Sequence, residues 1–196
     1  MWCATGSWLT SSPPTNVTEG AVAVADPPSP TGVEAPAEVV VSDDQDAVPL
    51  DAARWADLAG AVLSDRGCSG ELTLAFVDEA TITELNLEHM GAVGPTDVLS
   101  FPLDDPAERT GPDSPPMLIG DVVICPAVAE RQFAEHAGTL VDELALLVVH
   151  GVLHVLGHDH AEPEEARDMR ELERLLLERH HWSGPAPVAF SSEHRS

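Results

Sequence analysis

The sequence predicts one α/β or α+β domain, in which about five helices pack in layers against a four-stranded sheet. Between residues 36 and 182, short apolar runs of strand length alternate with longer segments whose apolar residues recur at helical spacing. The chain has 196 residues, of which 43% are hydrophobic, so it has room and material for one ordinary core. Helices interleaved with strands bury their apolar faces by lying against a sheet.

The two ends of the chain differ from this central domain. Residues 1–35 are rich in Pro, Ser, Thr, Gly and Ala, and we expect a disordered extension there. We expect residues 183–196 to form a flexible C-terminal tail, which leaves 36–182 as the working domain. The chain has no apolar run of membrane-spanning length and no secretory signal pattern, and its three cysteines are far apart. These features predict a cytoplasmic protein without disulfides.

The first half of the domain is predicted to alternate strands with helices. Its elements are a strand over 38–41, a helix over 49–66, a strand over 71–77 and a helix over 78–88. Gly67 is expected to stop the first helix, because glycine is the usual residue just past a helix end. Asp78 is expected to cap the second helix, because its carboxylate can accept hydrogen bonds from the first turn.

The second half is predicted to contain two strands followed by three helices. The elements are a strand over 97–101, a loop over 104–116, a strand over 117–124, and helices over 126–136, 140–156 and 163–180. Thr139 and Asp142 resemble a capping box at the start of the helix over 140–156. Residues 144–149 are all apolar, which indicates that this helix is buried.

Three histidines at the end of this buried helix predict a metal site. His150 and His154 stand at positions i and i+4, so their rings project from one flank of the helix. Gly157 can end the helix, and the returning chain can bring His160 as a third ligand. The spacing His-x-x-x-His-x-x-Gly-x-x-His matches the ligand framework of metzincin proteases.

This ligand set is typical of a catalytic zinc ion. Three protein nitrogens leave a fourth position for a water molecule, whose pKa the metal lowers to about 7. A single histidine on a buried helix is usually a core residue, but four histidines within eleven residues favour a metal site. We therefore predict one zinc ion. His158 is left over, and it either supports a ligand or is merely solvated.

The protease interpretation has a specific defect at Gly151. Zinc proteases carry a glutamate general base at this position, and without it proton transfer loses roughly 10²–10⁴-fold. Asp159 is the nearest carboxylate in sequence and is a candidate acid, base or ligand support, although a turn residue is an equally good interpretation. The catalytic group, beyond a metal-bound water, is therefore unknown from the sequence.

Several segments in order resemble the YbeY family of bacterial rRNA maturation factors, which are described as metal-dependent endoribonucleases specific for single strands. The segments are Leu85-Asn86, the eight residues from Pro95 to Pro102 (PTDVLSFP), Gly120-Asp121-Val122-Val123-Ile124, and His150 through His160. The resemblance covers about 38–180, and the PTDVLSFP block with the three-histidine motif is highly specific.

The resemblance implies an α+β fold with helices packed against a small mixed sheet, and zinc bound by His150, His154 and His160. It implies hydrolysis of phosphodiester bonds in maturation of the 16S rRNA 3′ end and in late ribosome quality control. The implied partners are ribosomal RNA, with ribosomal proteins or the small ribosomal subunit, and neither DNA nor a membrane.

Two features disagree with this function. Many family members carry an arginine that can contact RNA phosphate where this chain has Met90, and His89 is the nearest substitute. The net charge is −25, with nine arginines and no lysine, and such a surface repels RNA. A non-enzymatic ribosome-assembly factor and a zinc hydrolase of another bond are therefore the alternatives. Arginines gathered at the metal site would favour RNA chemistry.

Overall fold

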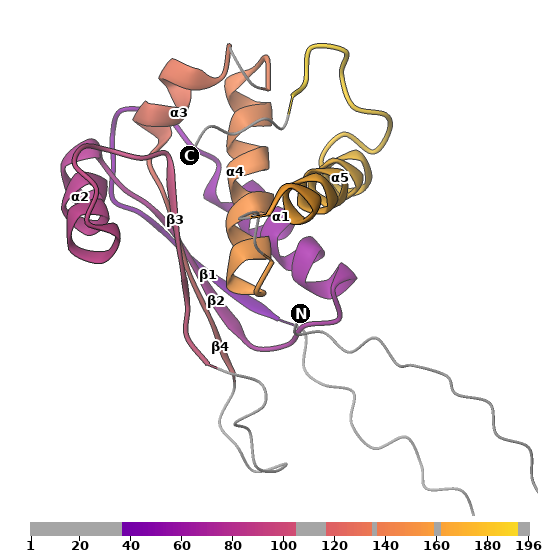
Figure 1. The fold of residues 1–196 in the computed structure, drawn as a ribbon, viewed down its shortest axis with the longest axis horizontal. Helices are drawn as coiled ribbons and strands as arrows, with labels where there is room; N and C mark the ends of the chain where they lie inside the picture. The colour runs from indigo at the N-terminus through magenta and orange to yellow at the C-terminus, as the bar shows by residue number, and fades with distance from the viewer. Residues whose placement is uncertain (1–36, 105–116, 135–136, 159–161, 192–196) are drawn as a thin grey trace, which may run out of the picture.

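The computed structural model describes residues 37–104, 117–134, 137–158 and 162–191. They form an α+β domain with one four-stranded mixed sheet and helices against it, as predicted (Figure 1). The predicted N-terminal extension and most of the predicted loop over 104–116 lie outside the described residues. None of the helices in the described ranges is long and apolar enough to cross a membrane.

The observed elements follow the predicted ones closely. In chain order they are β1 (Glu38–Asp43), α1 (Ala52–Asp65), β2 (Glu71–Phe76), α2 (Glu79–Leu85), the short π-helix η1 (Asn86–Met90), β3 (Val98–Pro102), β4 (Leu118–Ile124), α3 (Pro126–Gln132), α4 (Leu140–Val155) and α5 (Pro163–His180). The helix predicted over 78–88 is in fact α2 continued by η1, which ends where Gly91 adopts the left-handed conformation. The helix predicted over 126–136 ends earlier, at Gln132.

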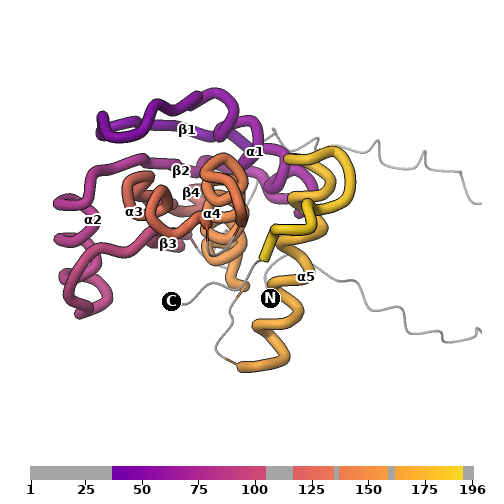
Figure 2. The backbone as a smooth tube through the Cα atoms, turned by 90° about the horizontal axis from the view of Figure 1, so that it is seen from above, coloured from indigo at the N-terminus to yellow at the C-terminus, as the bar shows by residue number. Residues whose placement is uncertain are grey.

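The strands lie in the order β1-β2-β4-β3. The first two neighbouring pairs are parallel, whereas β3 runs antiparallel to β4 and forms one edge of the sheet. Figure 2 shows the four strands side by side in this order, with α1 and α4 on the same side of them. The sheet is therefore mixed, as the family resemblance implied.

The two faces of the sheet bury different helices. Side chains on successive strand residues point to opposite faces. One face carries a large core shared with α1, α4 and α5; its sheet residues are Leu72, Leu74, Phe76, Ile119, Val122 and Ile124. The other face carries a smaller core shared with α2 and α3; its members are Val77, Ile82, Leu99, Val123, Cys125 and Val128. The helix with the candidate ligands thus lies against the larger core.

Local sequence determines both ends of α4. The Thr139 hydroxyl accepts a hydrogen bond from the backbone N–H of Asp142 at 3.1 Å, which caps the helix start as predicted. Gly157 has φ of +84°, a left-handed conformation that costs a glycine little, and it follows the helix end. Thirteen of the sixteen residues of α4 are buried, so the helix is held on nearly all sides.

The first residues of the predicted C-terminal tail contact the domain. The Phe190 ring lies 4.8 Å from the Trp182 ring, and both side chains pack against the larger core. Ala189 lies beside Gly138, near the start of α4. The flexibility expected over 183–196 stays a prediction, with residues 192–196 outside the described ranges.

Candidate metal centre

His150 and His154 meet on one flank of α4, as their spacing predicted. The two Nε2 atoms are 3.1 Å apart, and the ring centroids are 4.5 Å apart. His150 is buried, with 7% of its surface exposed, whereas His154 is partly exposed. One ring therefore belongs to the interior, and its partner reaches the surface.

Glu173 of α5 fixes the orientation of the His150 ring. Its Oε1 lies 2.7 Å from His150 Nδ1, and both side chains are almost fully buried. A carboxylate accepts here, so the Nδ1–H donates and the Nε2 lone pair is directed at His154. Glu173 was not among the residues predicted for the site. The available signal was a carboxylate on the same apolar helix face as Met169, Leu176 and Leu177.

The observed pair fits a shared metal ion. Two nitrogens bound to tetrahedral zinc at about 2.0–2.1 Å would be about 3.3 Å apart, close to the observed 3.1 Å. Metal-binding histidines commonly donate their other N–H to a carboxylate, which raises the basicity of the ligand. The two nitrogens, together with the carboxylate that supports one of them, therefore fit zinc or a similar transition-metal ion.

The remaining members of the predicted site lie outside the described residues. These are His160, the predicted third ligand, and Asp159, the candidate acid or base; both stay predictions. Within the described ranges, no group of three or more His, Cys, Asp or Glu side chains is placed to hold one metal ion. His158 is partly buried, and burial followed by the positive charge of Arg66 lowers the pKa of its imidazole.

Gly151 occupies a position where α4 touches the sheet. A Cβ atom added there would lie 2.4 Å from Val122 Cγ1 and 3.3 Å from Ser100 Oγ. A contact of 2.4 Å is far below van der Waals separation, so the Val122 side chain or the strand that carries it would have to shift to admit any side chain. The flank that carries the glutamate base in zinc proteases is therefore closed by the sheet here.

The loop that lacks the family arginine presents a different surface. Met90 ends η1 with 54% of its surface exposed. The neighbouring His89 packs edge-on against Phe101 of β3, with ring centroids 4.9 Å apart. The described loop thus offers a thioether and an imidazole where an arginine would offer a fixed positive charge.

Comparisons with known proteins agree with the motifs. Residues 40–181 match the family model described as Endoribonuclease YbeY. A protein of that name from Mycolicibacterium smegmatis is 44% identical over 131 residues, which is 65% of this chain and 72% of the relative. Another, from Frankia casuarinae, is 45% identical over 146 residues, covering 71% of this chain and 72% of the relative.

The fold is also similar to a solved structure. The solution structure of TM1509 from Thermotoga maritima superposes with a TM-score of 0.51 at 24% identity, covering 74% of this chain and 90% of that one. At this identity the likeness concerns the fold alone. The family match over residues 40–181 goes further, because it spans most of the chain and includes the two histidines on α4. The chain therefore belongs to the YbeY family.

Proposed function

We propose that the protein is a zinc-dependent endoribonuclease that cuts single-stranded ribosomal RNA in the cytoplasm, in maturation of the 16S 3′ end and in late ribosome quality control. The observation that carries the proposal is the pair of Nε2 atoms 3.1 Å apart, with His150 held by buried Glu173. Relatives that share this part of the chain are named Endoribonuclease YbeY.

Three histidines would hold the ion, and Glu173 would support one of them. His150 and His154 supply two nitrogens from α4, and His160 is proposed as the third. A bound zinc ion would act as a Lewis acid toward a phosphoryl oxygen and would lower the pKa of water. Glu173 accepts a hydrogen bond from the Nδ1–H group of His150, which leaves the Nε2 lone pair for the ion. Asp159 remains the candidate for proton transfer.

A peptide hydrolase is the weaker alternative because of Gly151. The chain lacks the glutamate base at that position, and Val122 leaves no room for one. Phosphodiester hydrolysis does not depend on a carboxylate at this point of the helix, because the metal itself supplies the main electrostatic stabilisation.

A non-enzymatic ribosome-assembly factor is the second candidate, and the charge favours it. Residues 36–182 hold 30 acidic residues against eight arginines. Such a surface would favour recruitment by basic ribosomal proteins over direct contact with RNA.

The deciding experiment is cleavage of a short labelled RNA containing the 16S 3′ end, in single-stranded form and annealed to a complement. Wild type with verified zinc content is compared with His150→Ala/His154→Ala. His180→Ala serves as a histidine control outside the ligand set, because His180 contacts Asp65 at the end of α1. We expect cleavage of the single strand by wild type and His180→Ala and none by the double variant. No cleavage by fully metallated wild type, together with binding to small ribosomal subunits, would establish the assembly factor instead.

A further inference from the structure

The arginines of this acidic chain are unevenly distributed. Seven of the nine lie in the described residues, and four of these seven are on α5, namely Arg167, Arg170, Arg174 and Arg179. The same helix supplies Glu173 to His150. The helix that supports the candidate ligand therefore also carries most of the described positive charge.

Three of these arginines form a row on one flank of α5. Arg167, Arg170 and Arg174 follow one another at spacings of three and four residues, which places them above one another on a helix surface. At about 100° per residue around the helix axis, Arg167, Arg170 and Arg174 lie about 120°, 60° and 100° from Glu173, respectively, and all three lie on the same side of it. Arg179 lies on the opposite side, about 120° away. We call Arg167, Arg170 and Arg174 the arginine row.

The row faces away from the end of α1. Arg179 and His180 both contact the Asp65 carboxylate in the last turn of α1, which places that helix on the Arg179 side of α5. Figure 2 shows α5 beginning on the side where β3 lies and passing α4 on its way to α1. Arg170 precedes Glu173 by three residues, about 4.5 Å along the helix axis. The row thus lies next to Glu173, the residue that contacts His150, on the flank of α5 that α1 leaves open.

The row's guanidinium groups are available to a ligand. Among the described residues, Arg167 pairs only with its neighbour Asp168, at 3.0 Å, with 69% of each side chain exposed. Arg174 contacts Glu178 one turn away at 2.9 Å. Arg170 is exposed, and no carboxylate in the described part of the chain pairs with it. Exposed ion pairs of this kind contribute little, so a phosphate group can replace them.

Two of the other arginines, Arg131 and Arg179, join elements of the fold. Arg131 of α3 makes two hydrogen bonds to the Glu79 carboxylate of α2, at 2.5 and 3.0 Å, and so joins two helices. Arg179 joins α5 to α1 through Asp65. These two side chains are as exposed as the row, at 54% and 64%, but their partners belong to other elements. They provide a matched control.

We propose that the arginine row binds the sugar–phosphate backbone of single-stranded RNA beside the metal pair. The inference rests on the proposed function. The arginine row would supply the positive charge that Met90 does not. A guanidinium group binds phosphate through two parallel N–H donors, so three arginines along one helix flank can follow a strand. The acidic remainder of the surface repels RNA and limits contact to this flank.

The test measures binding and cleavage of a fluorescein-labelled single-stranded RNA containing the 16S 3′ end. Arg167→Gln/Arg170→Gln is compared with Arg131→Gln/Arg179→Gln in the full chain loaded with zinc, because both change the net charge by two. Anisotropy is followed over a series of salt concentrations. We expect the row variant to raise Kd about tenfold and to make the slope of log K against log salt shallower by about 1.4, since each phosphate contact on a single strand contributes about 0.7. The control should keep the wild-type Kd and slope, and Arg167→Lys/Arg170→Lys should keep the slope.

The outcomes separate this inference from the endoribonuclease proposal. Equal weakening by the row and control variants would show an effect of net charge alone and would overturn the row. An unchanged Kd and salt slope in the row variant, with cleavage intact, would overturn the row and leave the function standing. Binding that depends on the row in a wild type that does not cleave would support the row and refute the nuclease. Wild type that fails to bind at low salt would overturn the row directly.

Discussion

Two histidine–carboxylate pairs join α4 to the chain around α5, and they lie in opposite parts of α4. Toward its end, His150 Nδ1 lies 2.7 Å from Glu173 Oε1. At its start, Asp142 Oδ1 lies 2.8 Å from Nε2 of His181, the residue that follows α5. In both pairs the side chains are nearly buried. By these contacts alone the two pairs would be indistinguishable.

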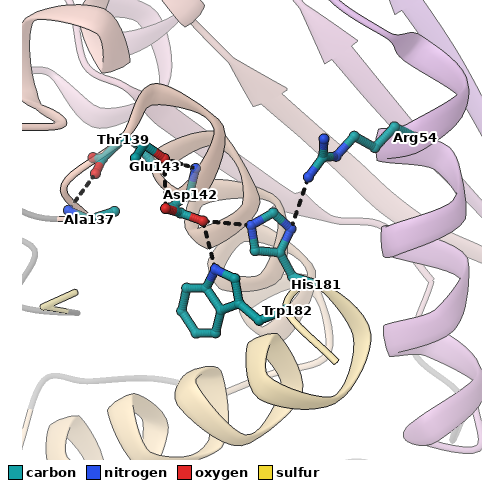
Figure 3. A network of polar contacts seen from close by, with 7 residues as sticks. All are labelled: Arg54, Ala137, Thr139, Asp142, Glu143, His181 and Trp182. Atoms are coloured by element: carbon teal, nitrogen blue, oxygen red, sulfur yellow. Dashed lines mark hydrogen bonds and ion pairs between the residues drawn. The ribbon is translucent and has the colours of Figure 1, made fainter. Parts of the chain in front are cut away.

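The second nitrogen of each ring distinguishes the pairs. His150 Nε2 faces the Nε2 of His154, so two nitrogens meet at one point. His181 Nδ1 instead faces the guanidinium group of Arg54 at 3.4 Å (Figure 3). A guanidinium only donates hydrogen bonds and carries a fixed charge, so it uses the lone pair of His181 and repels a metal cation. A buried histidine–carboxylate pair therefore indicates a metal site only where the second nitrogen of the histidine faces another possible metal ligand.

The pair at the start of α4 has a structural role instead. Asp142 accepts hydrogen bonds from the Thr139 hydroxyl at 2.6 Å, from Trp182 Nε1 at 2.7 Å and from His181. Figure 3 shows these donors converging on one carboxylate, with Thr139 at the start of α4 and His181 and Trp182 just after α5. The contact connects residues 39 and 40 positions apart in the sequence, and it ties the end of α5 to the start of α4.

The largest expected effect is on metal binding, and only the pair that contains His150 should show it. His154→Ala should reduce bound zinc from about one ion per chain to almost none, because it removes one of the facing nitrogens. His181→Ala should keep its zinc. Metal content after gel filtration, measured by mass spectrometry, checks both. Full zinc occupancy in His154→Ala would refute the assignment of His154 as a ligand. Zinc loss in folded His181→Ala would refute the distinction between the two histidine–carboxylate pairs.

The next largest expected effect is on stability, and it should be confined to the pair of Asp142 and His181. Asp142→Ala leaves buried donors on Trp182 and His181 without their acceptor, and it should lower the free energy of unfolding by about 3 kcal/mol. Urea denaturation of the zinc-free chain measures this. Asp168→Ala, at a carboxylate with 69% of its side chain exposed, should change stability by about 0.5 kcal/mol or less. Similar losses in the two variants would rule out a structural role for the Asp142 contacts.

Replacement of the supporting carboxylate should give a smaller effect. Glu173→Gln keeps the shape and an acceptor for His150 but removes the charge, so we expect zinc affinity to weaken about 10–100-fold. Competition with a chromophoric chelator gives the affinity. Glu171→Gln, at an exposed position on the same helix, is the control and should retain wild-type affinity. An unchanged affinity in Glu173→Gln would mean that Glu173 only fills space.

The smallest expected effect is a difference in pH dependence between zinc binding at His150 and stabilisation by Asp142. Burial alone would raise the pKa of Asp142, but hydrogen bonds from Thr139, Trp182 and His181 outweigh it and lower the pKa. A lowered pKa means that the stabilisation is complete above the unfolded value of about 3.9 and is lost as the pH falls through the folded value. Zinc should leave earlier, below about pH 6, because histidine ligands must be unprotonated.

A pH titration of the wild type with two readouts tests this order. Zinc release should precede the decline in the stability difference between wild type and Asp142→Ala. A stability difference that already declines near pH 6, together with zinc release, would assign the effect to a histidine instead of Asp142.

Local signals in the sequence were sufficient to predict α4 and the facing positions of its two histidines. The Thr139 cap, the apolar run and Gly157 each act within a few residues, and all three were confirmed. The facing positions of His150 and His154 follow from helix geometry alone. The strand order could not be derived in this way, because strand pairing joins distant segments; the mixed sheet was expected only from the family resemblance.

The contacts that support the two pairs could not be predicted from the sequence, for a physical reason. Glu173 lies 23 residues from His150, and its role depends on how α5 crosses α4. Asp142 was interpreted as part of a cap, which it is, but its contacts with His181 and Trp182 arise from tertiary structure. The missing glutamate at Gly151 was visible in the sequence, whereas the reason for its absence required the position of Val122.

The contact between Gly151 and Val122 has an evolutionary consequence. A change from this site to a peptidase would need a glutamate at position 151 and a smaller residue at 122 together. Gly151→Glu alone would overpack the interface, and Val122→Ala alone would leave a cavity in the core, so each single step should lower stability. The two positions are in contact and their effects would not add. Few substitutions would separate this site from that of a peptidase. Because α4 lies so close to the sheet, however, the single variants between the two should be unstable.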